Sequence, residues 1–113
     1  MDTNEFNKII SVIADIDIQN VFNDEFRIKK LNIYNLRDIL ISLGKIHYED
    51  LENNIYIVSI YGGFFKKNRA LVAFHLEEKR IMIAISANEG IIDQHTCREV
   101  YYEIRKKLEK FIE

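Results

Sequence analysis

The sequence has no proline, no tryptophan, four glycines and one cysteine, Cys97, among 113 residues. Because proline and glycine interrupt regular structure, their scarcity argues against long loops and flexible linkers. A single cysteine excludes an internal disulfide and is typical of a reducing compartment. The first residues are polar and acidic, unlike a secretory signal, and no run approaches the roughly 18 apolar residues of a membrane span. We therefore expect a cytoplasmic protein without contact to a membrane.

The length suits a single domain, 1–113, and the apolar fraction of 48% suffices for a core without metal, cofactor or disulfide. The net charge of −2 provides no cationic field that would attract nucleic acid. Charge is nevertheless uneven along the chain. Six acidic residues and one lysine precede residue 26, whereas lysine and arginine gather at 66–69 and 105–110. An acidic and a basic region are thus expected on the surface.

Three apolar segments, 55–61, 71–76 and 81–86, form the central block of the chain. The charged turn Glu77–Arg80 between the last two favours an antiparallel hairpin. Successive side chains of a strand point to opposite faces, and in all three segments both faces are largely apolar. A sheet with one solvated face alternates between apolar and polar residues. We therefore expect both faces to be covered, by helices or by a second copy of the chain in a homodimer.

Helical periodicity marks three segments. Apolar residues recur every three or four positions in three sets: Phe6, Ile9, Ile10 and Ile13; Leu36, Ile39, Leu40 and Leu43; and Cys97, Val100, Tyr101, Ile104, Leu108 and Phe111. The first set predicts a helix over Thr3–Ala14. The second predicts a helix capped by Asn32 or Asn35 and ended by Gly44 in a left-handed conformation. The third predicts a long helix from the cap Asp93 to about Phe111.

The segments between these elements are less regular. Residues 15–20 are expected to form a loop, and Lys45–Tyr48 to begin the sheet. Residues Val21–Ile33 fit either a helix or a strand, and we assign a helix. The predicted fold class is therefore α+β, with N-terminal helices, a three- or four-stranded mainly antiparallel sheet and a long C-terminal helix.

Candidates for catalysis or metal binding are few. Cys97, near the start of the last helix, is a potential nucleophile with His95 or His75 as its base. However, residues two apart on a helix do not face each other, and Cys97 belongs to an apolar stripe, which favours a buried structural thiol. The histidines at 47, 75 and 95 lack the short spacing of metal ligands. We expect no catalytic residues, no cofactor and no metal.

The predicted function is binding to another protein. The acidic residues form two clusters, Asp15, Asp17, Asp24 and Glu25 in one and Glu49, Asp50 and Glu52 in the other, and Phe64 and Phe65 lie in an expected hairpin tip beside lysines. Carboxylates can occupy a cationic site meant for phosphates. We therefore predict a small inhibitor or immunity protein, of antitoxin type, that neutralises a basic toxin or nuclease. The alternatives are an enzyme that uses Cys97 with a histidine, and a nucleic-acid-binding accessory protein that uses Phe64–Arg69.

Overall fold

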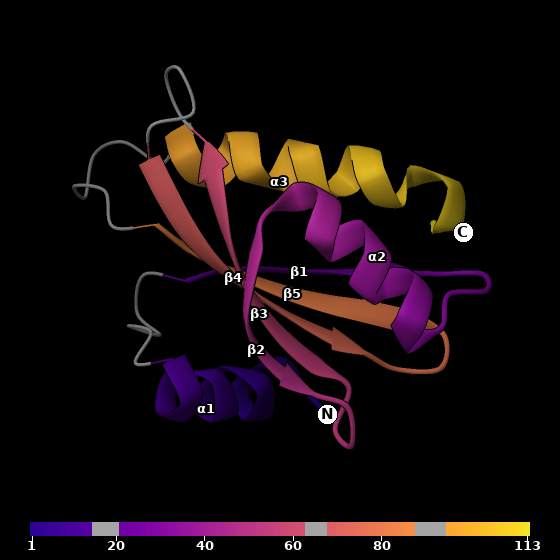
Figure 1. Ribbon diagram of the computed structural model, residues 1–113. Helices are drawn as coiled ribbons and strands as arrows, with labels where there is room; N and C mark the ends of the chain where they lie inside the picture. The colour runs from indigo at the N-terminus through magenta and orange to yellow at the C-terminus, as the bar shows by residue number, and fades with distance from the viewer. Residues whose placement is uncertain (15–20, 63–67, 88–94) are drawn as a thin grey trace.

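The computed structural model describes residues 1–14, 21–62, 68–87 and 95–113. Its elements are α1 (Thr3–Ala14), β1 (Phe22–Arg27), α2 (Ile33–Leu43), β2 (Lys45–Asp50), β3 (Ile55–Gly62), β4 (Asn68–Leu76), β5 (Arg80–Ala87), α3 (His95–Leu108) and the 3₁₀ turn η3 (Glu109–Phe111). The strands form one antiparallel sheet in the order β1-β5-β4-β3-β2 (Figure 1). The predicted α+β class is confirmed, with five strands in place of three or four. Within the described ranges, no helix has the length and apolar character needed to cross a membrane.

Helices cover both faces of the sheet. The helix α1 lies on one face, and α2 and α3 lie on the other (Figure 1). Residues Tyr56 and Val58 of β3 belong to the core under α2 and α3, whereas Ile57 between them belongs to the core under α1. The predicted burial of both faces is therefore confirmed, and the chain's own helices supply the cover.

The helix predicted over Val21–Ile33 is wrong, because Phe22–Arg27 is strand β1, Ile28 forms an isolated bridge and only Ile33, the first residue of α2, is helical. This strand pairs with β5 along its whole length, from Phe22 opposite Ile85 to Arg27 opposite Arg80, so its backbone partners lie far away in the sequence. Only Phe26 of the strand is buried. With a single buried side chain, neither the period of a helix nor that of a strand is visible, and tertiary pairing decides the conformation.

Gly44 ends α2, but its conformation differs from the one predicted. Its φ of −175° and ψ of −152° are extended, since the chain runs directly from α2 into β2. Glycine is needed there for a different reason. A Cβ at this position would lie 2.0 Å from the carbonyl oxygen of Ser59 in β3, so only a residue without a side chain allows this close approach.

The other predicted helices are confirmed. Helix α1 has the predicted bounds, and α2 is capped by Asn32, whose side chain accepts from the backbone N–H of Asn35 at 2.8 Å. Helix α3 continues into the 3₁₀ turn η3, and Ile112 then forms an isolated antiparallel bridge with Ile28. The expected loop at 15–20 and the cap Asp93 lie outside the described residues.

Candidate protein-binding surface

The described residues of the two predicted acidic clusters lie at opposite edges of the sheet. Asp24 and Glu25 belong to β1, Glu49 and Asp50 belong to β2, and Glu52 lies in the turn after β2. In the strand order these two strands are the outermost. The described residues of one cluster are therefore separated from those of the other by the three inner strands. The remaining predicted residues, Asp15, Asp17, Phe64 and Phe65, fall in the ranges that the structure does not describe.

The acidic residues of β1 are occupied by contacts within the chain. The Asp24 carboxylate accepts a hydrogen bond from the Tyr101 hydroxyl and, through Oδ1, one from the Glu25 backbone N–H at 2.8 Å. Burial and the contact with Asp24 raise the pKa of Tyr101. The Glu25 carboxylate lies 2.7 Å from an Arg80 guanidinium nitrogen. These carboxylates therefore also stabilise the fold at β1.

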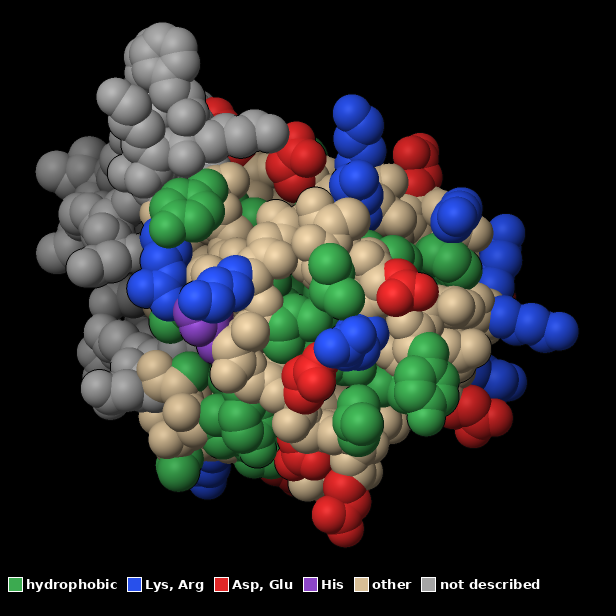
Figure 2. All heavy atoms as spheres, viewed as in Figure 1, with side chains coloured by type: hydrophobic (Ala, Val, Ile, Leu, Met, Phe, Trp, Pro, Cys, Tyr) green, Lys and Arg blue, Asp and Glu red, His purple; other side chains and the backbone are tan. Residues whose placement is uncertain are grey.

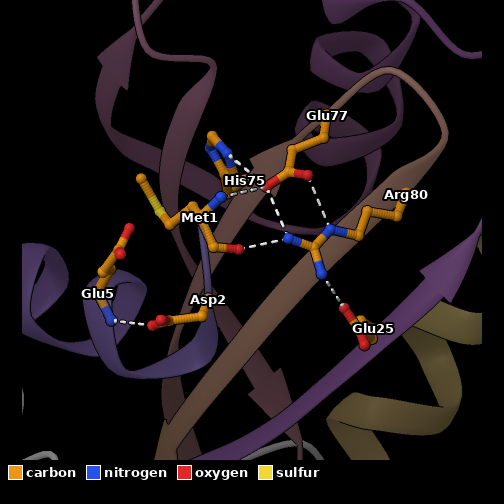
Figure 3. Close-up of polar contacts among 7 residues, drawn as sticks. All are labelled: Met1, Asp2, Glu5, Glu25, His75, Glu77 and Arg80. Carbon is orange, nitrogen blue, oxygen red and sulfur yellow. Dashed lines mark hydrogen bonds and ion pairs between the residues drawn. The ribbon is translucent and has the colours of Figure 1, made fainter.

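Arg80 is the centre of the polar network shown in Figure 3. Its guanidinium contacts both carboxylate oxygens of Glu77, at 2.8 and 3.0 Å, and also donates to the backbone carbonyl of Met1. Glu77 in turn lies 3.3 Å from the amino group of Met1 and 3.4 Å from Nε2 of His75. Hydrogen bonds from Arg80 are the main cause that lowers the pKa of Glu77 to about 2, and Glu77 raises the pKa of Arg80. The network thus ties the first residues and β1 to the β4–β5 turn.

The acidic residues of the β2 edge are held differently. Arg37 of α2 contacts Glu49 of β2 at 2.6 Å from Nε to Oε1, which fixes the helix to the strand and raises the pKa of Arg37. The Asp50 carboxylate accepts from the backbone N–H of Asn53 at 3.0 Å and from its side chain at 2.8 Å. These hydrogen bonds lower the pKa of Asp50, which is therefore ionised at neutral pH. Glu52 is exposed and forms no ion pair with any residue in the described ranges.

Exposed apolar side chains accompany these carboxylates. Tyr34, Ile41 and Leu51 have exposed fractions of 70%, 52% and 53%. Tyr34 and Ile41 are seven residues apart, so they lie on one side of α2, and Leu51 follows β2. Acidic and hydrophobic side chains stand side by side on the lower part of the face seen in Figure 2. We give the name acidic α2–β2 surface to the following residues of α2, β2 and the turn after β2: Tyr34, Arg37, Asp38, Ile41, Glu49, Asp50, Leu51 and Glu52.

Sequence reasoning found only the carboxylates of this surface that lie on or after β2. Tyr34 and Ile41 are in the predicted helix but off its buried stripe, and this exposure is the signal that would have indicated them. The contact between Arg37 and Glu49 depends on how α2 packs beside β2, which no local pattern shows.

The catalytic alternative with His75 is not supported by the placement of Cys97. The Cys97 side chain is buried, with 6% exposed, in the core between α3 and the sheet. His75 is directly opposite Met82, whose side chain belongs to the core under α1. Since cross-strand partners share a face, the sheet separates His75 from Cys97. The side chain of His95 lies outside the described part of the chain. In the described ranges, no three His, Cys, Asp or Glu residues are grouped so that they could hold a metal ion.

Comparisons of the chain with protein-family models, with curated proteins and with solved structures found no match.

Proposed function

We propose that the chain is a non-catalytic protein-binding module, an inhibitor or immunity protein of antitoxin type, which neutralises a basic toxin or nuclease through the acidic α2–β2 surface. The observation that carries the proposal is the exposure of Tyr34 and Ile41 on α2 and of Leu51, which lies between Asp50 and Glu52 in the chain. Protein interfaces commonly combine central aromatic or aliphatic anchors with a charged rim.

The charge of this surface favours a basic partner. The cation of Arg37 is already paired with Glu49, so the negative charges of Asp38, Asp50 and Glu52 are not balanced by it. Negative surfaces steer positively charged proteins and accelerate their association, and salt screens this effect. In a nuclease, the cationic groups that hold the substrate phosphates are the natural targets of such carboxylates.

The surface is also held rigid before binding. The contact between Arg37 and Glu49 joins α2 to β2, and Asn54, with a φ of 56°, completes the turn that Asp50 and Asn53 stabilise. A surface that is already ordered loses less conformational entropy when it binds. This pre-organisation is what a tight inhibitor needs.

The experiment begins with capture of host proteins on the tagged chain at low salt, followed by elution with salt. A basic protein that elutes is purified, and its affinity is measured for the wild type and for Glu52→Lys. The matched control is Glu103→Lys, which makes the same charge change on an exposed position of α3. Leu51→Ala is measured as well. The proposal predicts that Glu52→Lys and Leu51→Ala each bind the partner about tenfold or more weakly than the wild type does, and that Glu103→Lys binds it with unchanged affinity. Equal affinities for all four proteins would refute it.

A further inference from the structure

A second polar cluster lies at the start of β2, on the side of the sheet that carries α1. It consists of Lys45 and His47 of β2, Ser59 and Tyr61 of β3, and Arg69 of β4. The strand register brings these residues together, because Lys45 is directly opposite Ser59 and Tyr61 is directly opposite Arg69. Cross-strand partners share a face and have Cβ atoms about 5 Å apart.

An irregularity of β2 places His47 in this cluster. The register shifts between Ile46 and Tyr48, so His47 is an extra residue without a partner on β3, as in a β-bulge. Its Nε2 atom lies 2.8 Å from Oγ of Ser59 and 3.3 Å from a guanidinium nitrogen of Arg69. In Figure 2 a histidine side chain lies directly beside Lys or Arg side chains. Bulges often redirect a side chain toward a functional site.

Two polar groups contact Nε2 of His47. The Arg69 guanidinium only donates hydrogen bonds, whereas the Ser59 hydroxyl donates or accepts according to the tautomer of the ring. Ser59 is buried, with 4% exposed, and therefore positions the imidazole, while His47 and Arg69 are exposed. The exposed nitrogen-bearing side chains of the cluster are thus the imidazole of His47, the guanidinium of Arg69 and the ammonium of Lys45.

The cations of this cluster are not neutralised by the part of the chain that the structure describes. Neither Lys45 nor Arg69 forms an ion pair there. Beside them, Tyr61 has an exposed fraction of 56%. Two cations and an imidazole suit a phosphate, since charge-assisted hydrogen bonds to phosphate oxygens are short and strong. An exposed aromatic ring on a sheet suits a base, because stacking on such rings requires no particular sequence.

We propose that this cluster binds a nucleoside phosphate. Arg69, Lys45 and His47 hold the phosphate, Ser59 fixes the imidazole, and the base stacks on Tyr61. This ligand chemistry occurs both in a free nucleotide and in a single-stranded nucleic acid. The site is separate from the acidic α2–β2 surface and does not depend on the function proposed for that surface.

The test is a titration of the ¹⁵N-labelled full chain, followed by NMR, with AMP, inorganic phosphate, adenosine and a short oligothymidylate. The proposal predicts shifts confined to β2, β3 and β4, with AMP binding more tightly than phosphate or adenosine. Tighter binding of the oligonucleotide than of AMP also supports the site and identifies a strand as its ligand. The absence of shifts with both AMP and the oligonucleotide up to about 10 mM would overturn the proposal, since it limits the binding free energy to under about 3 kcal/mol.

Three variants separate the proposed contacts from general electrostatics. Arg69→Gln is expected to weaken AMP and phosphate binding about tenfold. Tyr61→Ala is expected to weaken AMP binding about tenfold and to leave phosphate binding unchanged. The control is Lys79→Gln, which removes one exposed positive charge at the β4–β5 turn and is expected to change neither affinity. Equal losses for Arg69→Gln and Lys79→Gln would overturn the proposal, and thermal unfolding of each variant verifies that it is folded.

Discussion

The Glu77→Gln variant tests the polar network around Arg80. The carboxylate of Glu77 contacts Arg80 through both oxygens and lies 3.3 Å from the Met1 amino group (Figure 3). These contacts lower the pKa of Glu77 from 4.5 to about 2. A shift of this size corresponds to about 3 kcal/mol of stability. Because 28% of the Glu77 side chain is exposed to water, which screens the pair, we expect Glu77→Gln to lower the free energy of unfolding by about 2 kcal/mol at neutral pH.

The sign of the pH dependence follows from the direction of the shift. A carboxyl group whose pKa is lower in the folded state stabilises the fold above its unfolded pKa, and this contribution disappears as the pH falls through the folded value. For Glu77 the window extends from about pH 4.5 down to about pH 2. The difference in unfolding free energy between the wild type and Glu77→Gln should therefore decrease as the pH falls through this window.

The assay is urea unfolding of both proteins at several pH values, with the linear extrapolation of the unfolding free energy. Glu78→Gln is the matched control, because Glu78 is the exposed neighbour and forms no ion pair with the described residues. It should change stability by less than about 0.5 kcal/mol at every pH. A Glu77→Gln effect of the same size at pH 7 and pH 2.5 would refute the reasoning, since it would show that the charge of Glu77 is not what stabilises the fold.

Three further predictions concern the stability of the fold and the accessibility of the Cys97 thiol. Gly44→Ala should destabilise the protein by about 3 kcal/mol in urea unfolding, because the new Cβ clashes with the Ser59 carbonyl; a change under about 1 kcal/mol would contradict this close approach. Phe6→Ala should lower the free energy of unfolding by about 3–5 kcal/mol, since Phe6 of α1 is fully buried against the sheet. Val12→Ala, at an 85% exposed position of the same helix, should lower it by under about 0.5 kcal/mol. Similar losses for the two variants would show that α1 is not packed on the sheet as described. Labelling of Cys97 by a thiol reagent should be at least about a hundredfold slower in native than in unfolded protein, and comparable rates would indicate an accessible thiol.

The sequence predicts those elements of the fold that bury several side chains at regular spacing. The stripe of α1 contains Phe6 and Ile10, both fully buried, and its spacing identifies the helix and its bounds. The apolar character of both faces of β3, β4 and β5 correctly predicts that both faces are covered, but does not decide between helices and a second copy of the chain. Burial of several side chains on one element leaves a periodic pattern that local reasoning can read.

The edge strands and the surfaces are not predictable in the same way. β1 and β2 each have one neighbour, so fewer of their side chains are buried and their pattern is faint. The separation of Asp24 from Glu49 is a consequence of strand order, and the cluster at His47 is a consequence of a shift in register. Both depend on which strands pair, which involves residues far apart in the sequence. Local sequence patterns therefore found some of the charged residues but not their partners.

The central claim is that the acidic α2–β2 surface binds a basic protein. Its most direct test is the affinity of the salt-eluted partner for the wild type, Glu52→Lys and Glu103→Lys, measured by titration calorimetry at low and at high salt. The account predicts that Glu52→Lys binds about tenfold or more weakly than the wild type at low salt, that Glu103→Lys binds as the wild type does, and that salt weakens wild-type binding. A partner that binds all three proteins equally, or whose affinity does not depend on salt, would contradict it.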